Sequence, residues 1–229
     1  MLTWNDFLQA TDIRGISESK KPFFDVHIKA CQQALFQGNS KHFCCLPSVE
    51  QWRLWEEFRD EACFVDIETN YRNNITVLGI SDGTRVWQFV RHHNLDGKEV
   101  ERVLKQFKLI VTFNGASFDL PIIRRYFQGV IPEVPHIDLR HAGARAGLTG
   151  GLKKIEQEIG IARGEGVDEF SGADALKLWS AYRKTGNKQL LHLLLEYNAE
   201  DVVNLKPLAD HIYGRLEAQT SKLLKTSTH

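Results

Sequence analysis

The sequence of 229 residues has no excess of charge of either sign, because 29 Lys and Arg residues balance 29 Asp and Glu residues. A neutral protein exerts little long-range attraction on nucleic acid or on an acidic membrane, so any phosphate-binding surface must be local. No apolar run approaches the roughly 18 residues of a membrane span, and the first residues lack the basic and then apolar pattern of a signal peptide. We therefore expect a cytoplasmic protein with no membrane partner.

Cysteine is also scarce, and the four cysteines show no C-x2-C spacing. They fit a reducing compartment better than a disulfide framework in a chain of this length. Three of them share the polar first 60 residues with two histidines, in the set His27, Cys31, His42, Cys44 and Cys45. A zinc site is one interpretation of this set, but free thiols and surface histidines explain unpaired spacing better. The role of residues 1–47 and of these cysteines stays open.

A change of composition near Leu46 and Pro47 predicts the domain organisation. We expect a helical or irregular N-terminal extension over 1–47, one domain over 48–217 and a flexible tail over 218–229. The hydrophobic content of 42% is enough to bury a sizeable core. The capping-box spacing of Ser48 and Gln51 predicts a helix that leads into the first strand.

Apolar runs and turn signals predict an α/β domain with five strands, over 63–67, 75–80, 86–90, 109–113 and 135–139. Ser-Asp-Gly-Thr at 81–84 is a strong hairpin signal, so the sheet should begin antiparallel. Asp96 and Gly97 then open a helix with apolar residues at i, i+3, i+4 and i+7. Such a helical crossing suits a parallel pairing of the later strands, and residues 151–216 are mainly helical in pattern.

The first strand, in "ACFVDIETN", ends in Asp66 and Glu68. Because side chains alternate along a strand, the two carboxylates should lie on one face, a few ångströms apart. Like charges at this distance raise one another's pKa unless a cation offsets them. Oxygen-rich acidic clusters suit Mg²⁺ or Mn²⁺. Taken alone, however, this motif is explained as well by a solvated strand end.

Two further acidic motifs favour a metal site over a solvated strand end. "VTFNGASFDLP" places Asp119 at the start of a helix, where aspartate is also a common cap. "LLEYNAEDVVNL" forms an amphipathic helix with Tyr197 and Asp201 four residues apart on one face. Each motif by itself is explained as well by core packing or by a solvated surface. Only the three motifs in this order indicate a function.

In this order the three motifs resemble those of the DEDD exonucleases of the ribonuclease H-like superfamily, in the DEDDy subgroup, which has Tyr in the third motif. The sequence is most similar to bacterial YprB-like exonuclease domains and more distantly to the proofreading domains of family B DNA polymerases. The likeness covers 52–216 and includes "TGGLKKIEQEIGI" at 149–161. It implies a ribonuclease H-like fold, with three antiparallel strands followed by two parallel ones and flanked by helices.

The resemblance also implies a site. Its metal-binding carboxylates correspond to Asp66, Glu68, Asp119 and Asp201, which would hold two divalent ions, Mg²⁺ or Mn²⁺. Two such ions can activate a water and stabilise the leaving 3′-oxygen during phosphodiester cleavage. Tyr197 would orient that water, and Thr69 and Asn114 would lie near the terminal nucleotide, although local capping explains those two about as well. The implied activity is a 3′→5′ exonuclease acting on single-stranded DNA or RNA 3′ ends.

Two alternatives stay open. The first is a non-catalytic domain that binds nucleic acid or protein, although a complete set of motif residues speaks against it. The second is a nuclease of short oligonucleotides, which a neutral net charge permits. The basic residues Arg140, Arg145, Lys153, Lys154 and Arg163 form either a rim that binds the nucleic-acid backbone or a solvated helix face. Asp138 is either a neighbour of the metal ligands or a polar strand end.

Overall fold

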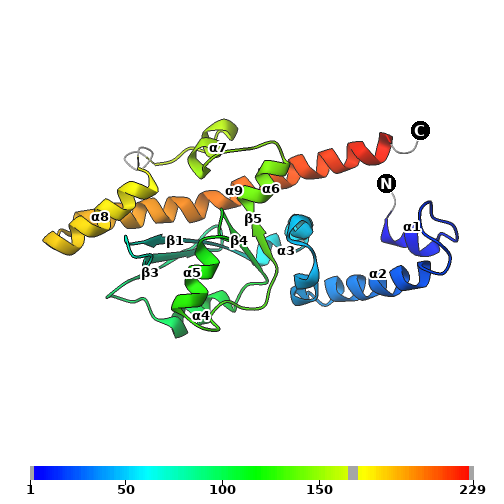
Figure 1. Cartoon of the computed structure of the whole chain (residues 1–229), viewed down its shortest axis with the longest axis horizontal. Helices are drawn as coiled ribbons and strands as arrows, with labels where there is room; N and C mark the ends of the chain where they lie inside the picture. The colour runs from blue at the N-terminus through cyan, green and yellow to red at the C-terminus, as the bar shows by residue number, and fades with distance from the viewer. Residues whose placement is uncertain (1–2, 165–169, 227–229) are drawn as a thin grey trace.

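A computed structural model of the chain describes residues 3–164 and 170–226, and it is built around a five-stranded mixed sheet (Figure 1). The strand order is β3-β2-β1-β4-β5, in which the first three strands pair antiparallel and the last two join in parallel. The strands are β1 (Ala62–Thr69), β2 (Ile75–Ser81), β3 (Val86–Val90), β4 (Leu109–Thr112) and β5 (His136–Asp138). The fold class predicted from the sequence is confirmed.

The hairpin between β2 and β3 has the turn chemistry that the sequence predicts. Asp82 Oδ1 accepts hydrogen bonds from the backbone nitrogens of Thr84 at 2.8 Å and Arg85 at 2.7 Å. Gly83 has a φ of +88°, which a residue with a side chain rarely adopts. These contacts fix the turn between β2 and β3. In the neighbouring β1–β2 pair Asp66 lies opposite Gly79, and β1 occupies the centre of the sheet.

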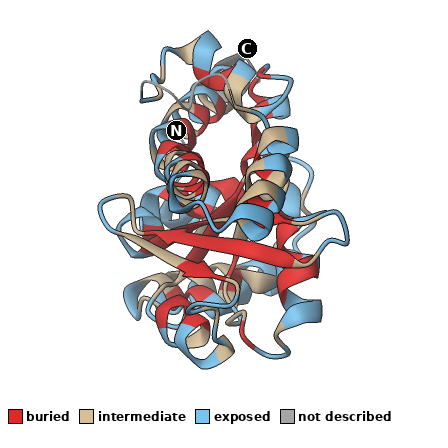
Figure 2. Cartoon of the chain, turned by 90° about the vertical axis from the view of Figure 1, so that its left-hand side faces the viewer, coloured by how far each residue is buried: buried red, intermediate tan, exposed pale blue. Residues whose placement is uncertain are grey.

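Alternating residues of the strands build a core on each face of the sheet. Phe64 and Val111 point to the face covered by α9 (Lys188–Thr226). Cys63, Val65 and Ile110 point to the opposite face, which α4 (Gly97–Leu104) and α5 (Asp119–Tyr126) cover. Figure 2 shows the buried strands between the two helical layers. The carboxylates of β1 therefore lie in the middle of a three-layer domain.

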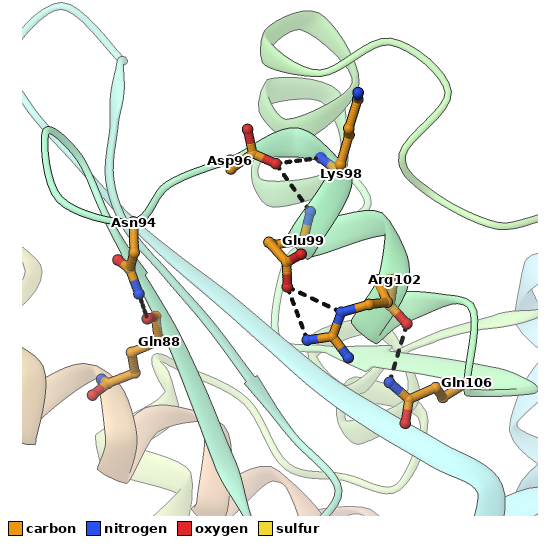
Figure 3. Close-up of polar contacts among 7 residues, drawn as sticks. All are labelled: Gln88, Asn94, Asp96, Lys98, Glu99, Arg102 and Gln106. Carbon is orange, nitrogen blue, oxygen red and sulfur yellow. Dashed lines mark hydrogen bonds and ion pairs between the residues drawn. The ribbon is translucent and has the colours of Figure 1, made fainter.

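Helix α4 makes the crossing that allows β4 to join the sheet in parallel. Asp96 Oδ1 accepts hydrogen bonds from the backbone nitrogens of Lys98 at 2.9 Å and Glu99 at 3.1 Å, so the predicted helix start is correct (Figure 3). One turn later, Glu99 forms an exposed ion pair with Arg102 at 2.9 Å. Val100, Val103 and Leu104 are buried on the other side of the helix.

The second half of the chain is helical, with α6 (Leu139–Arg145), α7 (Leu152–Ile159), α8 (Gly172–Thr185) and α9. Helix α6 begins directly after β5, and Asp138 caps it by accepting a hydrogen bond from the backbone nitrogen of Arg140 at 3.0 Å. Helix α9 runs along the sheet and continues beyond it (Figure 1). It includes 218–226, predicted as a tail, while 227–229 lie outside the described residues.

The N-terminal segment consists of short helices, and α1 (Trp4–Gln9) and α2 (Lys21–Phe36) project from the domain (Figure 1). The elements that follow are η1 (Ser40–Cys45), η2 (Ser48–Leu54), α3 (Trp55–Phe58) and η3 (Arg59–Glu61). The predicted helix at Ser48 is a 3₁₀ helix without a side-chain cap, because its N-cap residue is Pro47. Its apolar face is buried as predicted, through Trp52 and Leu54. Among residues 3–164 and 170–226, no helix is long and apolar enough to cross a membrane.

Candidate active site

Three carboxylates from two elements meet at the centre of the sheet. Strand β1 contributes Asp66 and Glu68, and α9 contributes Asp201, with one oxygen of each lying within 4.8 Å of the others. Period-2 alternation places the first two on one face, as predicted from the sequence, and α9 packs across β1 and β2. A set of closely spaced oxygen donors fits a hard divalent cation such as Mg²⁺ or Mn²⁺. In the described part of the chain this is the one His, Cys, Asp or Glu cluster that could hold a metal ion.

Asp119 is the first residue of α5 and is buried beside this cluster. It does not act as a helix cap, because Phe118 occupies the N-cap position. Its Oδ1 instead accepts a hydrogen bond from the backbone nitrogen of Ile67 at 3.0 Å. The bond ties α5 to β1 between the two acidic residues of that strand, and so fixes the fourth carboxylate next to the other three.

The carboxylates are difficult to ionise together. Burial is the largest cause that raises the pKa values of Asp66 and Glu68, and the charges of Asp201 and Asp119 raise them further. Burial also raises the pKa of Asp119 to about 7, although the hydrogen bond from Ile67 opposes the shift. Such a cluster ionises fully when a bound cation offsets the repulsion. The electrostatics therefore agree with the donor set in favouring a metal site.

The pKa of Asp119 predicts how stability depends on pH. Because its folded-state pKa of about 7 exceeds the ordinary 3.8, its contribution to stability is complete below about pH 4 and is lost as the pH rises through 7. This loss amounts to at most about 4 kcal/mol. Asp119→Asn should therefore stabilise the protein at pH 8, relative to wild type, more than at pH 5 in urea unfolding with EDTA. An equal effect at both pH values would contradict the assignment.

Tyr197 lies one helical turn before Asp201 on the same face of α9 and is buried, with 7% of its surface exposed. Burial and then the charges of Asp201, Glu68 and Asp66 raise its pKa, so its hydroxyl stays protonated in the physiological range. The guanidinium carbon of Arg163 lies 5.7 Å from the centre of its ring, and Lys153 Nζ lies 6.0 Å from it. The phenol is thus a fixed donor at the edge of the acidic cluster.

A cavity of about 480 Å³ opens above the carboxylates. Asp66, Glu68, Tyr197 and Asp201 all line it. Its other walls come from β1, the β1–β2 turn, the start of α5 and α8, through Ile67, Thr69, Asn70, Tyr71, Asn73, Phe118, Gly172 and Leu176. Tyr71 and Phe118 are 71% and 38% exposed, so their side chains face the solvent beside the carboxylates. The cavity therefore combines a charged floor with aromatic walls.

Thr69 and Asn114, both predicted to lie near the terminal nucleotide, differ in their position relative to the cavity. Thr69 lines the cavity, whereas Asn114 is absent from its described lining. Asn114 has a φ of +67°, and its Oδ1 accepts hydrogen bonds from Arg140 Nη1 at 2.9 Å and Ser117 Oγ at 3.0 Å. Its side chain thus has the local role that the sequence analysis left open, and a contact with substrate stays a prediction.

Two other ambiguous residues also have structural partners. Asp138 accepts hydrogen bonds from the backbone nitrogens of Asn114 at 2.8 Å and Ala116 at 3.0 Å, so it holds the loop that precedes α5. Arg163 fits neither a basic rim nor a solvated helix face, the two interpretations that the sequence left open, because its side chain is 5% exposed and forms ion pairs with Glu156 and Asp201. Glu156 is itself buried as the ion-pair partner of this arginine.

Sequence reasoning missed the residues that orient Asp66. Asn198 Nδ2 donates a hydrogen bond to Asp66 Oδ2 at 2.9 Å, and its Oδ1 accepts one from Gln88 Nε2 at 3.1 Å. Gly79 on the neighbouring strand makes room for this amide, because an added Cβ would lie 2.3 Å from Asn198 Oδ1. An isolated glycine inside the apolar strand "ITVLGIS" was the available signal, since it often marks a close approach of another group.

Gly79→Ala should therefore disturb the acidic cluster from a distance. The new methyl group must displace Asn198, whose side chain is fully buried and already bonded on both sides. We expect a loss of about 1–3 kcal/mol of unfolding free energy. The cost should be smaller in an Asn198→Ala background, where the clash is removed, and a double-mutant cycle in urea measures the difference. Additive effects would show that the two positions are independent.

The sheet order, with carboxylates on the central strand, defines the ribonuclease H-like class of α/β folds. Residues 63–213 match the family model RNase_H_2, described as RNase_H superfamily, and the chain therefore belongs to that superfamily. Its fold is similar to that of Escherichia coli RNase D, described as an exoribonuclease involved in structured RNA processing. That alignment has a TM-score of 0.51 and 19% identity, and it covers 73% of this chain but 43% of RNase D. No curated protein sequence matches the chain.

Proposed function

We propose that the protein is a metal-dependent 3′→5′ exonuclease of the DEDDy type, akin to YprB-like domains, that hydrolyses phosphodiester bonds at the ends of single-stranded nucleic acid. The observation that carries this proposal is the meeting of Asp66, Glu68 and Asp201 within 4.8 Å, in the cavity that Tyr197 also lines. A non-catalytic binding domain has no need for a buried carboxylate cluster, which costs folding free energy. A hydrolytic site needs one to hold its cation.

Each residue has a distinct part in this mechanism. The residues that would hold two divalent ions, Mg²⁺ or Mn²⁺, are Asp66, Glu68, Asp119 and Asp201. Bound ions supply an activated water and charge stabilisation of the leaving oxygen. The Tyr197 hydroxyl stays protonated and would orient the attacking water. Asn198 fixes the Asp66 carboxylate by donating a hydrogen bond to Oδ2.

The walls of the cavity support a single-stranded substrate. Exposed rings such as Tyr71 and Phe118 can stack on unpaired bases, a contact that tolerates any base sequence. A terminal nucleotide that enters the cavity passes Thr69 and meets the carboxylates. A duplex end must first unpair, which costs a few kcal/mol. We therefore propose a preference for single strands of DNA or RNA, in a cytoplasmic setting consistent with four free cysteines.

A cleavage assay with three kinds of substrate tests this function. The protein is incubated with 5′-labelled single-stranded DNA, with RNA of equal sequence, and with oligomers of two to five nucleotides, each in Mn²⁺ or in EDTA. An exonuclease leaves a ladder of shortened labelled products in Mn²⁺ and none in EDTA. A binding domain shifts the long strands on a native gel without shortening them, and a nuclease of short oligonucleotides degrades only the short substrates. Either of these outcomes would contradict the proposal.

A further inference from the structure

Arg163 is a buried cation in contact with the candidate metal site, and none of the three sequence motifs includes it. It follows α7, and its side chain is 5% exposed. Its Nε lies 2.6 Å from Glu156 Oε2 and its Nη2 lies 3.0 Å from Glu156 Oε1. This two-bonded contact between a planar guanidinium and a carboxylate fixes the orientation of the arginine. Glu156 itself is 1% exposed, so both partners are held inside the protein.

The same guanidinium reaches α9. Arg163 Nη2 lies 2.6 Å from Asp201 Oδ1, and its guanidinium carbon lies 5.7 Å from the centre of the Tyr197 ring. It therefore contacts both residues of the third motif at once. The chain of charges from Glu156 through Arg163 to Asp201 connects α7 to the helix that carries that motif.

This contact limits how Asp201 can bind a metal ion. The ion pair at Oδ1 sets the orientation of the carboxylate, and so the direction in which its oxygens face a cation. The hydrogen bond from Ile67 to Asp119 and that from Asn198 to Asp66 have comparable effects on their carboxylates. Outer partners of this kind fix the orientation of metal ligands in many sites.

We propose that Arg163, itself held by Glu156, is a positioning residue that orients the Asp201 carboxylate for metal binding. This inference rests on the proposed function, because it assigns a role in the same metal site. Two simpler explanations make different predictions. If Arg163 acts only through its charge, removing it makes the site more negative and cation binding tighter. If it only stabilises the fold, its loss lowers the melting temperature and leaves metal affinity unchanged.

Calorimetric titration of the full chain with Mn²⁺ separates these explanations without any substrate. Arg163→Gln should weaken Mn²⁺ binding by about 10- to 100-fold, the usual effect of losing an outer partner of a metal ligand. Arg163→Lys should restore only part of the affinity, because an ammonium group cannot contact two carboxylates as a planar fork does. Glu156→Gln should weaken binding in the same direction but less, since the arginine remains and loses only its anchor.

Two controls make the result decisive. Arg102→Gln removes an arginine from an exposed ion pair on α4 and should leave Mn²⁺ affinity unchanged (Figure 3). Asp201→Asn should lose most of the affinity for Mn²⁺. Unchanged binding in that variant would contradict both the assignment of the metal site and the proposed function. Unchanged or tighter binding in Arg163→Gln, with Asp201→Asn defective, would overturn the positioning role alone. If Arg163→Gln fails to fold, Arg163→Lys and Glu156→Gln carry the same test.

Discussion

Asp66→Asn should abolish metal-dependent cleavage, lowering the rate by roughly 10³-fold or more. The carboxylates act together in the proposed site, so losing one of them removes most of the activity. Asp66 lies on the central strand, and its oxygen is within 4.8 Å of oxygens from Glu68 and Asp201. Asparagine keeps the shape and can still accept the hydrogen bond from Asn198, but it lacks the charge that a divalent ion requires. The loss therefore reports on charge rather than on packing.

Thermal unfolding measures the same substitution without a substrate. Mn²⁺ should raise the melting temperature of the wild type, since a ligand that binds only the folded state stabilises it by mass action. Most of that increase should vanish in Asp66→Asn. Asp60→Asn is the matched control, because Asp60 is an exposed aspartate just before β1 and should keep the full increase. Equal increases in all three proteins would show that the cluster is not the metal site.

Tyr197→Phe should slow turnover by about 10²-fold, the scale typical of one group that assists proton transfer or orients water. Metal affinity should stay near that of the wild type, because the phenol is not among the carboxylates that meet at the site. The ring remains in place, so its packing against α8 residues such as Trp179 is kept. A reduced turnover with unchanged metal binding would separate the orienting role from the ligand role.

Tyr213→Phe provides the control for this experiment. Tyr213 lies on the same helix, several turns beyond Asp201, and is partly buried. Its ring packs against Trp52, with 5.9 Å between the ring centres. Its substitution should leave turnover unchanged. Unchanged turnover in Tyr197→Phe as well would make that tyrosine a packing residue.

Much of the fold could be predicted from the sequence because its signals are local. The observed strands begin and end close to the predicted limits, since apolar alternation and the turn at Asp82 and Gly83 depend on neighbouring residues. The shared face of Asp66 and Glu68 follows from the same alternation. Helix α9 extends further than predicted, because nothing in residues 218–226 stops a helix once it has started.

The polar partners of the site could not be predicted, because they join residues distant in the sequence. Asn198 is 132 positions from Asp66, and Arg163 joins Glu156 to Asp201 only when α7 lies beside α9. In the sequence, Arg163 is one more basic residue near Lys153 and Lys154, which suggested a surface rim. Arg163 lies in the interior because the tertiary fold buries it and pairs it with Glu156 and Asp201.

The position of a label on the substrate tests whether the carboxylate site hydrolyses nucleic acid from the 3′ end. One single-stranded oligonucleotide is labelled at its 5′ end in one sample and at its 3′ end in the other, and both are followed from the first seconds in Mn²⁺. We expect a descending ladder from the 5′ label and immediate release of labelled mononucleotide from the 3′ label, with neither product in EDTA or in Asp66→Asn. Immediate release of the 5′ label, or cleavage that persists in Asp66→Asn, would contradict this expectation.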